Sequence, residues 1–443
     1  MNRASKPVAP AGIGLNVSAK DSSQQTGKVL TVGRRLNVLV SAYACEPNKG
    51  SEPGIGWNQV RQTARFHEVW VITRSNNGPA IADSLAADPM ANVHWIYCDL
   101  PRWLRFWKKG MRGARLYYYL WQTNALRLAR KHHRHTKFDI VHHVTFGNYW
   151  QPTFLHFLPA RFVWGPVGGG ESAPANFLSS FGLRGSMYEI LRSCARKLAE
   201  LHPSVRRAAR HASVAVATTE QTACRLRRLG CTNVSVLCGI GIPDQDLNEL
   251  KAFPFRDAKP FRVLSVGRLL HWKGFQFALR AFGRFHAKFP EAEYWLVGEG
   301  PERGKLEQIA RRMGLERAVT LLGQLPRKEA LAKYLDCDAL LFPSFHESGG
   351  WVCLEAMAAG RPVICLDLGG PGLQVTSDTG IKVSAVTPEQ VVADLSTALE
   401  RLAADPAYCQ RLGAGGRSRV DRNFSWERKG EQIAALYAHL ASG

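Results

Sequence analysis

The sequence contains no apolar run that approaches the roughly 18 to 20 residues needed for a membrane-spanning helix. Residues 1–35 also lack the apolar core of a secretory signal, because they are rich in Ser, Ala, Gly, Gln and Lys. They predict a flexible tail. The two absences together predict a cytoplasmic protein.

Patterns typical of metal sites and disulfide frameworks are missing as well. The ten cysteines include no C-x-x-C pair, and several of them, such as Cys337, Cys353 and Cys365, lie in apolar surroundings. The fourteen histidines show no zinc-ligand spacing. We therefore expect buried free thiols in a reducing compartment, no metal site and no cofactor.

Acidic residues are scarce, with 36 Asp and Glu against 58 Lys and Arg, which gives a net charge of +22. Residues 1–250 hold 32 cations against 15 acids, a net of +17, so the first half carries most of the excess. Its densest part, 100–138, has eleven Lys or Arg, no acid, and interleaved Trp, Phe and Tyr residues. This mixture predicts contact with an anionic membrane surface. The alternative is that the rings are core and the cations are their solvated outer face.

The length of 443 residues predicts two domains, each with its own core. Strands that alternate with loops and helices predict an α/β fold with two Rossmann-like domains that face a central cleft. We expect a flexible tail over 1–35, a first domain over 36–245, a hinge over 246–260, a second domain over 261–423 and a terminal helix over 424–443.

The stretch Phe342 to Gly360, FPSFHESGGWVCLEAMAAG, places two acids eight residues apart at a strand-loop-helix junction. Gly349 and Gly350 would expose backbone N–H groups at the start of the helix, where the dipole favours a phosphate. Glu347 lies in the loop and Glu355 in the helix. An ionised carboxylate accepts hydrogen bonds from two vicinal hydroxyl groups, so this pair fits the diols of a nucleotide-sugar. The alternative is two unrelated surface acids.

Two cations follow the first strand of the second domain, in the stretch Gly267-Arg268-Leu269-Leu270-His271-Trp272-Lys273-Gly274. Arg268 and Lys273 flank the carboxyl end of that strand, where open α/β sheets bind ligands. Two fixed cations can neutralise a diphosphate leaving group without a metal ion.

Three loops of the first domain supply further candidates. Gly54 and Gly56 precede a helix expected from Trp57, and Gly169 and Gly170 end a strand in a triple-glycine loop that permits close approach of a ligand. Turns without a ligand are the alternative for both. The stretch 139–143, DIVHH, predicts a strand that ends in His142 and His143, and its alternation leaves open which of them faces the cleft.

HESGGWVCLEAMAAG resembles the E-x7-E signature of retaining glycosyltransferase family four, whose members have the GT-B fold. The resemblance extends over nearly the whole chain from about Leu36. It implies that Glu347 holds sugar hydroxyls, Glu355 the ribose, and Arg268 with Lys273 the donor diphosphate. It also implies that a histidine after the DIVHH strand lies near the reacting carbon, and that the terminal helix crosses back onto the first domain.

The resemblance implies retaining transfer from a nucleotide-diphosphate sugar to a glycan or polyprenyl-linked acceptor, in cell-surface polysaccharide biosynthesis at the inner face of the membrane. A GT-B nucleotide-sugar epimerase is the nearest enzymatic alternative. A basic nucleic-acid-binding protein is the alternative from another class, but no known nucleic-acid module occurs in the sequence, so we expect no nucleic-acid partner. The base, the sugar and the acceptor stay open.

Overall fold

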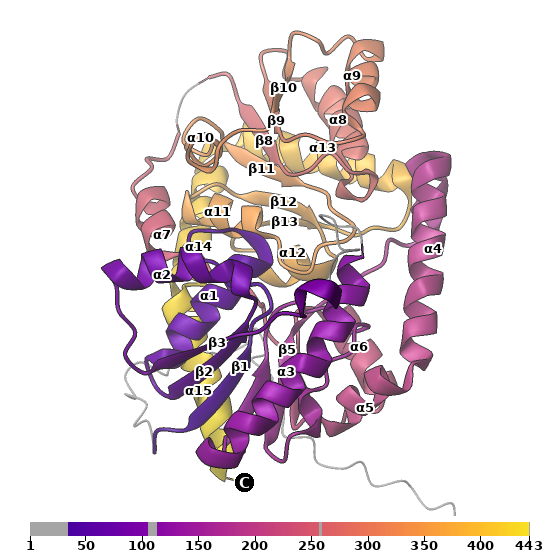
Figure 1. Cartoon of the computed structure of the whole chain (residues 1–443). Coiled ribbons are helices and arrows are strands. Elements are labelled where there is room, and N and C mark those ends of the chain that lie inside the picture. Colours follow the sequence, from indigo (N-terminus) through magenta and orange to yellow (C-terminus); the bar gives the residue numbers. More distant parts are fainter. Residues whose placement is uncertain (1–33, 105–112, 257–258, 443) are drawn as a thin grey trace, which may run out of the picture.

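A computed structural model describes residues 34–104, 113–256 and 259–442. Within these residues the chain forms two parallel sheets, one in each half of the sequence (Figure 1). The first sheet has the strand order β3-β2-β1-β4-β5-β6-β7, and the second has β10-β9-β8-β11-β12-β13. The predicted α/β fold with two Rossmann-like domains is confirmed.

The strands of the first domain are β1 (Asn37–Ser41), β2 (Glu68–Thr73), β3 (Val93–Tyr97), β4 (Ile140–His143), β5 (Arg161–Val167), β6 (Val214–Ala217) and β7 (Val234–Val236). Its helices are α1 (Ser51–Ala64), α2 (Gly78–Ala87), α3 (Ala114–Thr136), α4 (Gly182–Leu201), α5 (Pro203–His211) and α6 (Glu220–Arg228). The central strands are buried on both faces, as the runs NVLVS and VAVA predict for a covered parallel sheet.

The strands of the second domain are β8 (Arg262–Val266), β9 (Glu293–Val297), β10 (Val319–Gly323), β11 (Ala339–Phe342), β12 (Val363–Leu366) and β13 (Gly380–Val383). The helices from α7 onward are α7 (Asp244–Lys251), α8 (Phe275–His286), α9 (Arg303–Arg312), α10 (Arg327–Ala332), α11 (Trp351–Ala358), α12 (Gly369–Gln374), α13 (Pro388–Ala404), α14 (Pro406–Asn423) and α15 (Trp426–Ser442).

Two predicted boundaries were wrong. Helix α1 begins at Ser51, not at Trp57, since Pro53 lies in its first turn, where a missing N–H costs nothing. Residues 246–251, predicted as hinge, are the greater part of α7, and Leu247 and Leu250 of this helix are buried in the core of the second domain.

Each sheet has one point where successive connections leave in opposite directions. In the first sheet this point lies between β1 and β4, and in the second between β8 and β11. The loops at the carboxyl ends of such strands diverge and leave a crevice in which α/β proteins bind ligands. The stretches that hold Arg268, Lys273 and Glu347 are those loops in the second domain.

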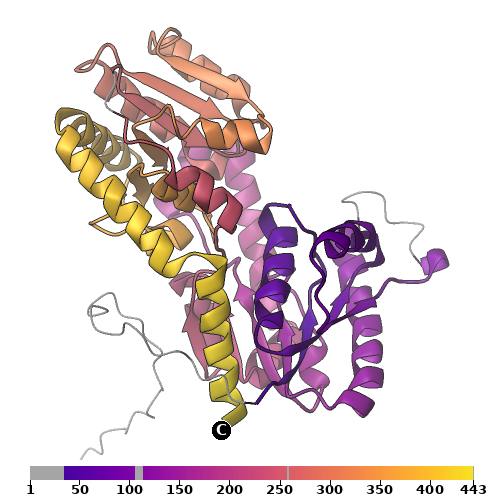
Figure 2. The ribbon, with the colours of Figure 1, turned by 90° about the vertical axis from the view of Figure 1, so that its left-hand side faces the viewer.

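The two domains are linked by more than one crossing. Helix α15 extends from the second domain into the first (Figure 2), where it packs against α1. In the other direction, the 3-10 helix Ala175–Phe181 places Phe177 and Phe181 in the core of the second domain, and the Phe177 ring lies 4.7 Å from that of Phe345 between centroids. The predicted return of the terminal helix is therefore observed.

Candidate active site

Lys273 and Glu347 meet at the crevice of the second sheet. Lys273 ends the short 3-10 helix His271–Lys273 after β8, and its amino group forms an ion pair with Oε2 of Glu347, in the loop after β11. The same ammonium lies 4.9 Å from the centroid of the Phe342 ring. Both charged side chains are mostly buried, so their attraction is only partly screened by water.

The N-terminus of α11 completes this group. Gly350 is the N-cap residue, with a φ of 74° that favours glycine, and its N–H donates to Oε1 of Glu347 at 3.2 Å. The carbonyl of Gly349 accepts a hydrogen bond from the Gln374 amide. Because Glu347 holds one of the helix N–H groups, a carboxylate occupies the position where this helix end can bind a phosphate.

Arg268 lies at the carboxyl end of β8 and is exposed. No ion pair joins it to another residue in the described part of the chain. The residue before it, Gly267, has a φ of 154°, and its carbonyl would lie 2.0 Å from a Cβ at Gly298. The loop after β8 is therefore held against the loop after β9, while the guanidinium of Arg268 stays available to an anion.

Glu355 is buried in α11, and both oxygens of its carboxylate have partners. Nη1 of Arg327 lies 3.0 Å from Oε1, and the Tyr334 hydroxyl donates to Oε2 at 3.1 Å. Burial raises the pKa of Glu355, while the Arg327 charge opposes the shift. Arg327 also pairs with Asp246 of α7. Arg327 was not among the predicted site residues. The sequence around it indicates only that a helix begins after Pro326.

The two histidines of β4 have different surroundings. Nδ1 of His142 lies 2.5 Å from the Tyr437 hydroxyl of α15, and Nε2 lies 2.5 Å from the Gly165 carbonyl, so both ring nitrogens are used in packing. Nε2 of His143 lies 3.3 Å from the Tyr118 hydroxyl. Burial lowers the pKa of His142 to about 4 and that of His143 to about 3, so both rings are neutral at physiological pH. The structure thus leaves His143 as the candidate.

The glycines of the first domain serve close contacts. A Cβ at Gly54 would lie 2.0 Å from the Lys49 carbonyl, and one at Gly56 would lie 2.1 Å from the Ala44 carbonyl, so both allow α1 to pack on the loop after β1. Trp351 of the second domain lies 3.5 Å from the same Gly54 position. Gly54 is therefore at the contact between the domains.

The triple-glycine loop touches the second domain through Glu171, which the sequence reasoning passed over although it follows the glycines. The Glu171 carboxylate accepts from the N–H of Gly169 at 2.9 Å and from the Ser348 hydroxyl at 2.8 Å. Gly170 donates to Thr222 at 3.1 Å. Since Ser348 follows Glu347, the loop with Gly169 and Gly170 borders the same crevice.

Part of the basic aromatic segment 100–138, which was predicted to contact a membrane surface, lies in the core. Tyr117, Tyr118 and Trp121 of α3 are almost fully buried in the core of the first domain, so they cannot lie at a lipid surface. Trp103 is exposed, and residues 105–112 lie outside the described part. Three of the aromatic rings of this segment thus belong to the core and not to the surface.

The described ranges bear on the cysteines, on groups of metal-ligand type and on long apolar helices. The ten cysteines are free thiols, as expected, although Cys194 and Cys224 are exposed. No group of three or more His, Cys, Asp or Glu side chains in the described ranges could hold a metal ion. No helix in the same ranges has the length and apolar character to cross a bilayer.

Comparisons with known proteins agree with this geometry. Residues 247–419 match the family model described as glycosyl transferases group 1. The glycogen synthase of Mycobacterium tuberculosis is 34% identical over 185 residues, which are 42% of this chain and 44% of that protein. The lipopolysaccharide core biosynthesis glycosyltransferase LpsD of Rhizobium meliloti is 35% identical over 169 residues, 38% of this chain and 46% of LpsD. The chain thus spans less than half the length of these relatives.

Solved structures match over most of the chain. Sucrose-phosphate synthase from Thermosynechococcus elongatus has a TM-score of 0.59 at 20% identity and covers 92% of this chain and 100% of its own. Anabaena Alr3699/HepE in complex with UDP has a TM-score of 0.57 at 16% identity, over 91% of this chain and 100% of its own. Together with the two sheets and the returning helix, these likenesses show the GT-B fold.

Proposed function

We propose that this protein is a retaining glycosyltransferase of family four that transfers a sugar from a nucleotide-diphosphate sugar. The observation that carries the proposal is the convergence of Lys273, Glu347 and the N–H of Gly350 at the crevice of the second sheet, with Arg268 exposed beside them. Cations and helix N–H groups suit a diphosphate, and the carboxylate suits sugar hydroxyls.

Each group has a role in the proposed reaction. Arg268 and Lys273 stabilise the negative charge that develops on the diphosphate as the glycosidic bond breaks, so the reaction needs no metal ion. When the diphosphate takes the ammonium of Lys273, the carboxylate of Glu347 is freed to accept from sugar hydroxyls. The N–H groups of Gly349 and Gly350 bind a phosphate oxygen.

Glu355 holds the ribose in this proposal. Its two oxygens have about four lone-pair positions, and Arg327 and Tyr334 use two of them. The remaining positions can accept from the ribose diol, and the Arg327 charge opposes the rise in the pKa of this carboxyl that burial causes. In this proposal His143, at the carboxyl end of β4, faces the donor from the first domain and lies near the reacting carbon.

The acceptor is a glycan or a polyprenyl-linked glycan, with a role in cell-surface polysaccharide biosynthesis in the cytoplasm at the inner face of the membrane. The similarity to LpsD, which is named for lipopolysaccharide core biosynthesis, supports this class of acceptor. The excess of cations in the first domain supports an anionic surface near it.

The test is a calorimetric titration of the full chain with UDP, GDP and ADP and their sugars, followed by transfer assays. The Anabaena HepE complex contains UDP, so UDP-sugars are the first donors to test. We expect one base to bind and its sugar to be transferred with the anomeric configuration kept, as read by proton NMR of the product. No binding of any nucleotide, or a product that is an isomer of the donor without an acceptor, would contradict the proposal.

A further inference from the structure

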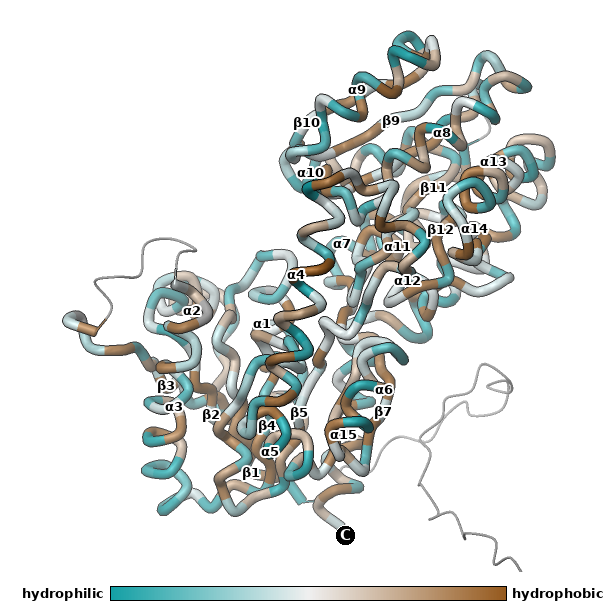
Figure 3. Tube along the Cα trace, turned by 90° about the vertical axis from the view of Figure 1, so that its right-hand side faces the viewer, coloured by the Kyte–Doolittle hydropathy of each residue, from teal (hydrophilic) through white to brown (hydrophobic). Residues whose placement is uncertain are grey.

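Helix α4 carries an apolar stripe on its solvent side. Its members recur at helical spacing and are 54% to 86% exposed, apart from Cys194, which is also exposed: Leu183, Met187, Ile190, Leu191, Cys194, Leu198 and Leu201. We call these residues the α4 stripe. Figure 3 shows α4 toward the viewer, along the side of both domains. A water-facing row of this length is unusual for a helix of a globular domain.

The opposite face of α4 is polar and faces the protein. Glu189 accepts from Nε2 of His271 at 2.9 Å and lies 3.0 Å from Nε2 of His346, both in the second domain. Arg192 donates to the Glu171 carbonyl at 2.8 Å, and Arg196 donates to the same carbonyl at 3.2 Å. The orientation of α4 is thus the reverse of that of an ordinary amphipathic helix. Its charged face forms hydrogen bonds and ion pairs with the crevice loops, while its apolar face is exposed to solvent.

The charges beside the stripe have one sign. The exposed Asp, Glu, Lys and Arg side chains of α4 and α5 are all cations: Arg184, Lys197, Arg206, Arg207 and Arg210. The acids of these helices, Glu189 and Glu200, are turned inward and paired. An apolar stripe flanked by cations is the pattern of a helix that lies in the headgroup region of an anionic bilayer.

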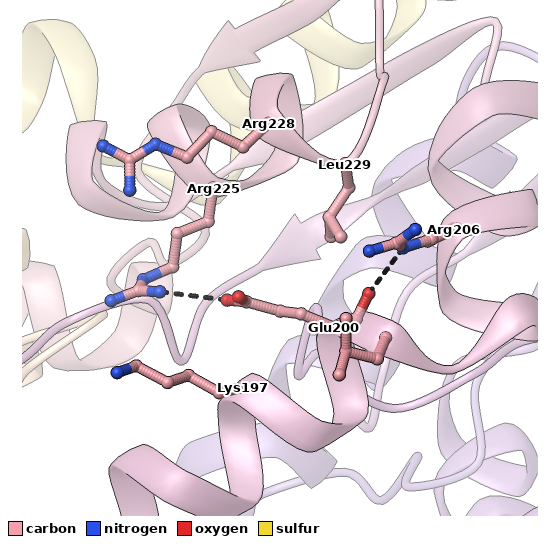
Figure 4. A pocket seen from close by; sticks show the side chains of 7 residues that line it. Lys197, Glu200, Arg206, Arg225, Arg228 and Leu229 are labelled. Carbon is pink, nitrogen blue, oxygen red and sulfur yellow. Dashed lines mark hydrogen bonds and ion pairs between the residues drawn. The ribbon is translucent and has the colours of Figure 1, made fainter.

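A basic pocket of about 290 Å³ adjoins the end of the stripe at Leu201. Figure 4 shows its cations, which come from α4, α5 and α6: Lys197, Arg206, Arg225 and Arg228. Glu200 is the acid that lines it, and it pairs with Arg225 at 2.9 Å. Lys197 and Arg228 form no ion pair within the described residues, so their charges stay free for a phosphate group.

We propose that α4 docks this protein on an anionic lipid surface, with the α4 stripe in the headgroup region and a lipid phosphate in the basic pocket. A second copy of the chain fits the stripe less well, because two copies would bring the flanking cations together on chains of net charge +22. A bilayer with anionic lipids offers apolar area and opposite charge at once.

The docked orientation would place the crevice near the membrane. Arg192 and Arg196 hold the loop around Gly170 against the inner face of α4, so that loop lies about one helix diameter, ~10 Å, from the lipid surface. A polyprenyl-linked sugar could reach the crevice over this distance. Only this last consequence rests on the proposed function, since docking itself does not need the transferase activity.

The first experiment is cosedimentation of the full chain with vesicles of phosphatidylcholine alone or mixed with phosphatidylglycerol. We expect binding only to the mixed vesicles. Leu191→Asp/Leu198→Asp should weaken this binding by at least about tenfold, because the new carboxylates oppose insertion of the apolar face and are repelled by anionic lipids. Lys197→Ser/Arg228→Ser should lose roughly fivefold for each cation. Leu335→Asp, at an exposed leucine of the second domain beside α10, is the control and should bind as the wild type does.

The second experiment uses the native thiol in the stripe and does not depend on variants of its leucines. An environment-sensitive fluorophore on Cys194 in a Cys224→Ser background should shift to the blue with mixed vesicles. The same label on Ala86→Cys of α2, which Figure 1 shows on the other side of the first domain, in a Cys194→Ser/Cys224→Ser background should not shift.

Two results would overturn the proposal: vesicle binding equal in wild type and stripe variant, or a wild-type dimer that the stripe variant converts to monomer while neither binds vesicles. The latter would assign the stripe to a second copy. Vesicle binding that depends on the stripe in a protein without nucleotide affinity would refute the proposed function and leave the docking in place.

Discussion

Replacement of Arg268 by alanine separates function from stability more cleanly than any other change in the site. The side chain is exposed and forms no ion pair within the described residues, so its loss should change the free energy of unfolding by no more than about 0.5 kcal/mol. If the guanidinium faces the leaving diphosphate, its loss should remove about 2 to 4 kcal/mol of transition-state stabilisation. This corresponds to a fall in kcat/KM of roughly 30- to 900-fold.

The assay is release of the nucleoside diphosphate from the donor identified by calorimetry, together with thermal melting of each variant. Lys273→Ala should lose a similar factor but also melt lower, because it leaves Glu347 without its ion-pair partner. Arg284→Ala, an exposed arginine on α8, is the matched control and should keep full activity. A kcat/KM of Arg268→Ala within threefold of the wild type would refute the reasoning, and an equal loss in the control would show that the effect is general charge attraction.

Four further predictions test the remaining groups. Glu355→Gln should weaken free-nucleotide binding, whereas Glu347→Gln should spare it and reduce transfer; equal losses of calorimetric affinity would contradict the separate roles. The pH profile of kcat/KM should show no inflection from His143 between pH 5 and 8, because burial holds its pKa near 3. Burial acts to raise the pKa of Glu189, but hydrogen bonds from His271 and His346 lower it to about 2 from 4.5. The stabilisation that Glu189 contributes is therefore complete above pH 4.5 and is lost as the pH falls toward 2. Glu189→Gln should make the free energy of unfolding depend less on pH in that range. Activity should survive EDTA, and a loss that magnesium restores would contradict the two-cation site.

Much of the fold was predictable because its strands are short apolar runs that end in glycine-rich loops. Runs such as ALLF over Ala339–Phe342 are buried on both faces, so composition alone marks them. The helix start at Ser51 was missed because Pro53, Gly54 and Gly56 normally break helices, and only the contact with the loop after β1 explains the glycines. Helix α7 was missed because it is short and lies between prolines.

The candidate site could be proposed from the sequence where its residues lie close together in the chain. Glu347, Gly349 and Gly350 share one loop. That loop follows the carboxyl end of a buried strand, where α/β sheets bind ligands. Arg327 was not predictable, because its contact with Glu355 crosses from α10 to α11 and leaves no spacing in the chain. The packing role of His142 also needed the structure, since its partner Tyr437 lies nearly 300 residues away in the sequence.

The orientation of α4 shows most clearly what a pattern of residues leaves undetermined. Its apolar spacing predicts an amphipathic helix, and the ordinary inference is that the apolar face packs inward. The reverse holds because the inner face meets polar groups: the carbonyls of the glycine loop need donors, which Arg192 and Arg196 supply, and His271 and His346 need the Glu189 carboxylate. Turning the helix over would leave these groups buried without partners. That would cost more free energy than the burial of a few leucines would recover. The exposed stripe is therefore enforced by the crevice itself, and whatever surface covers the stripe also bears on the loops at which the sugar is proposed to be transferred.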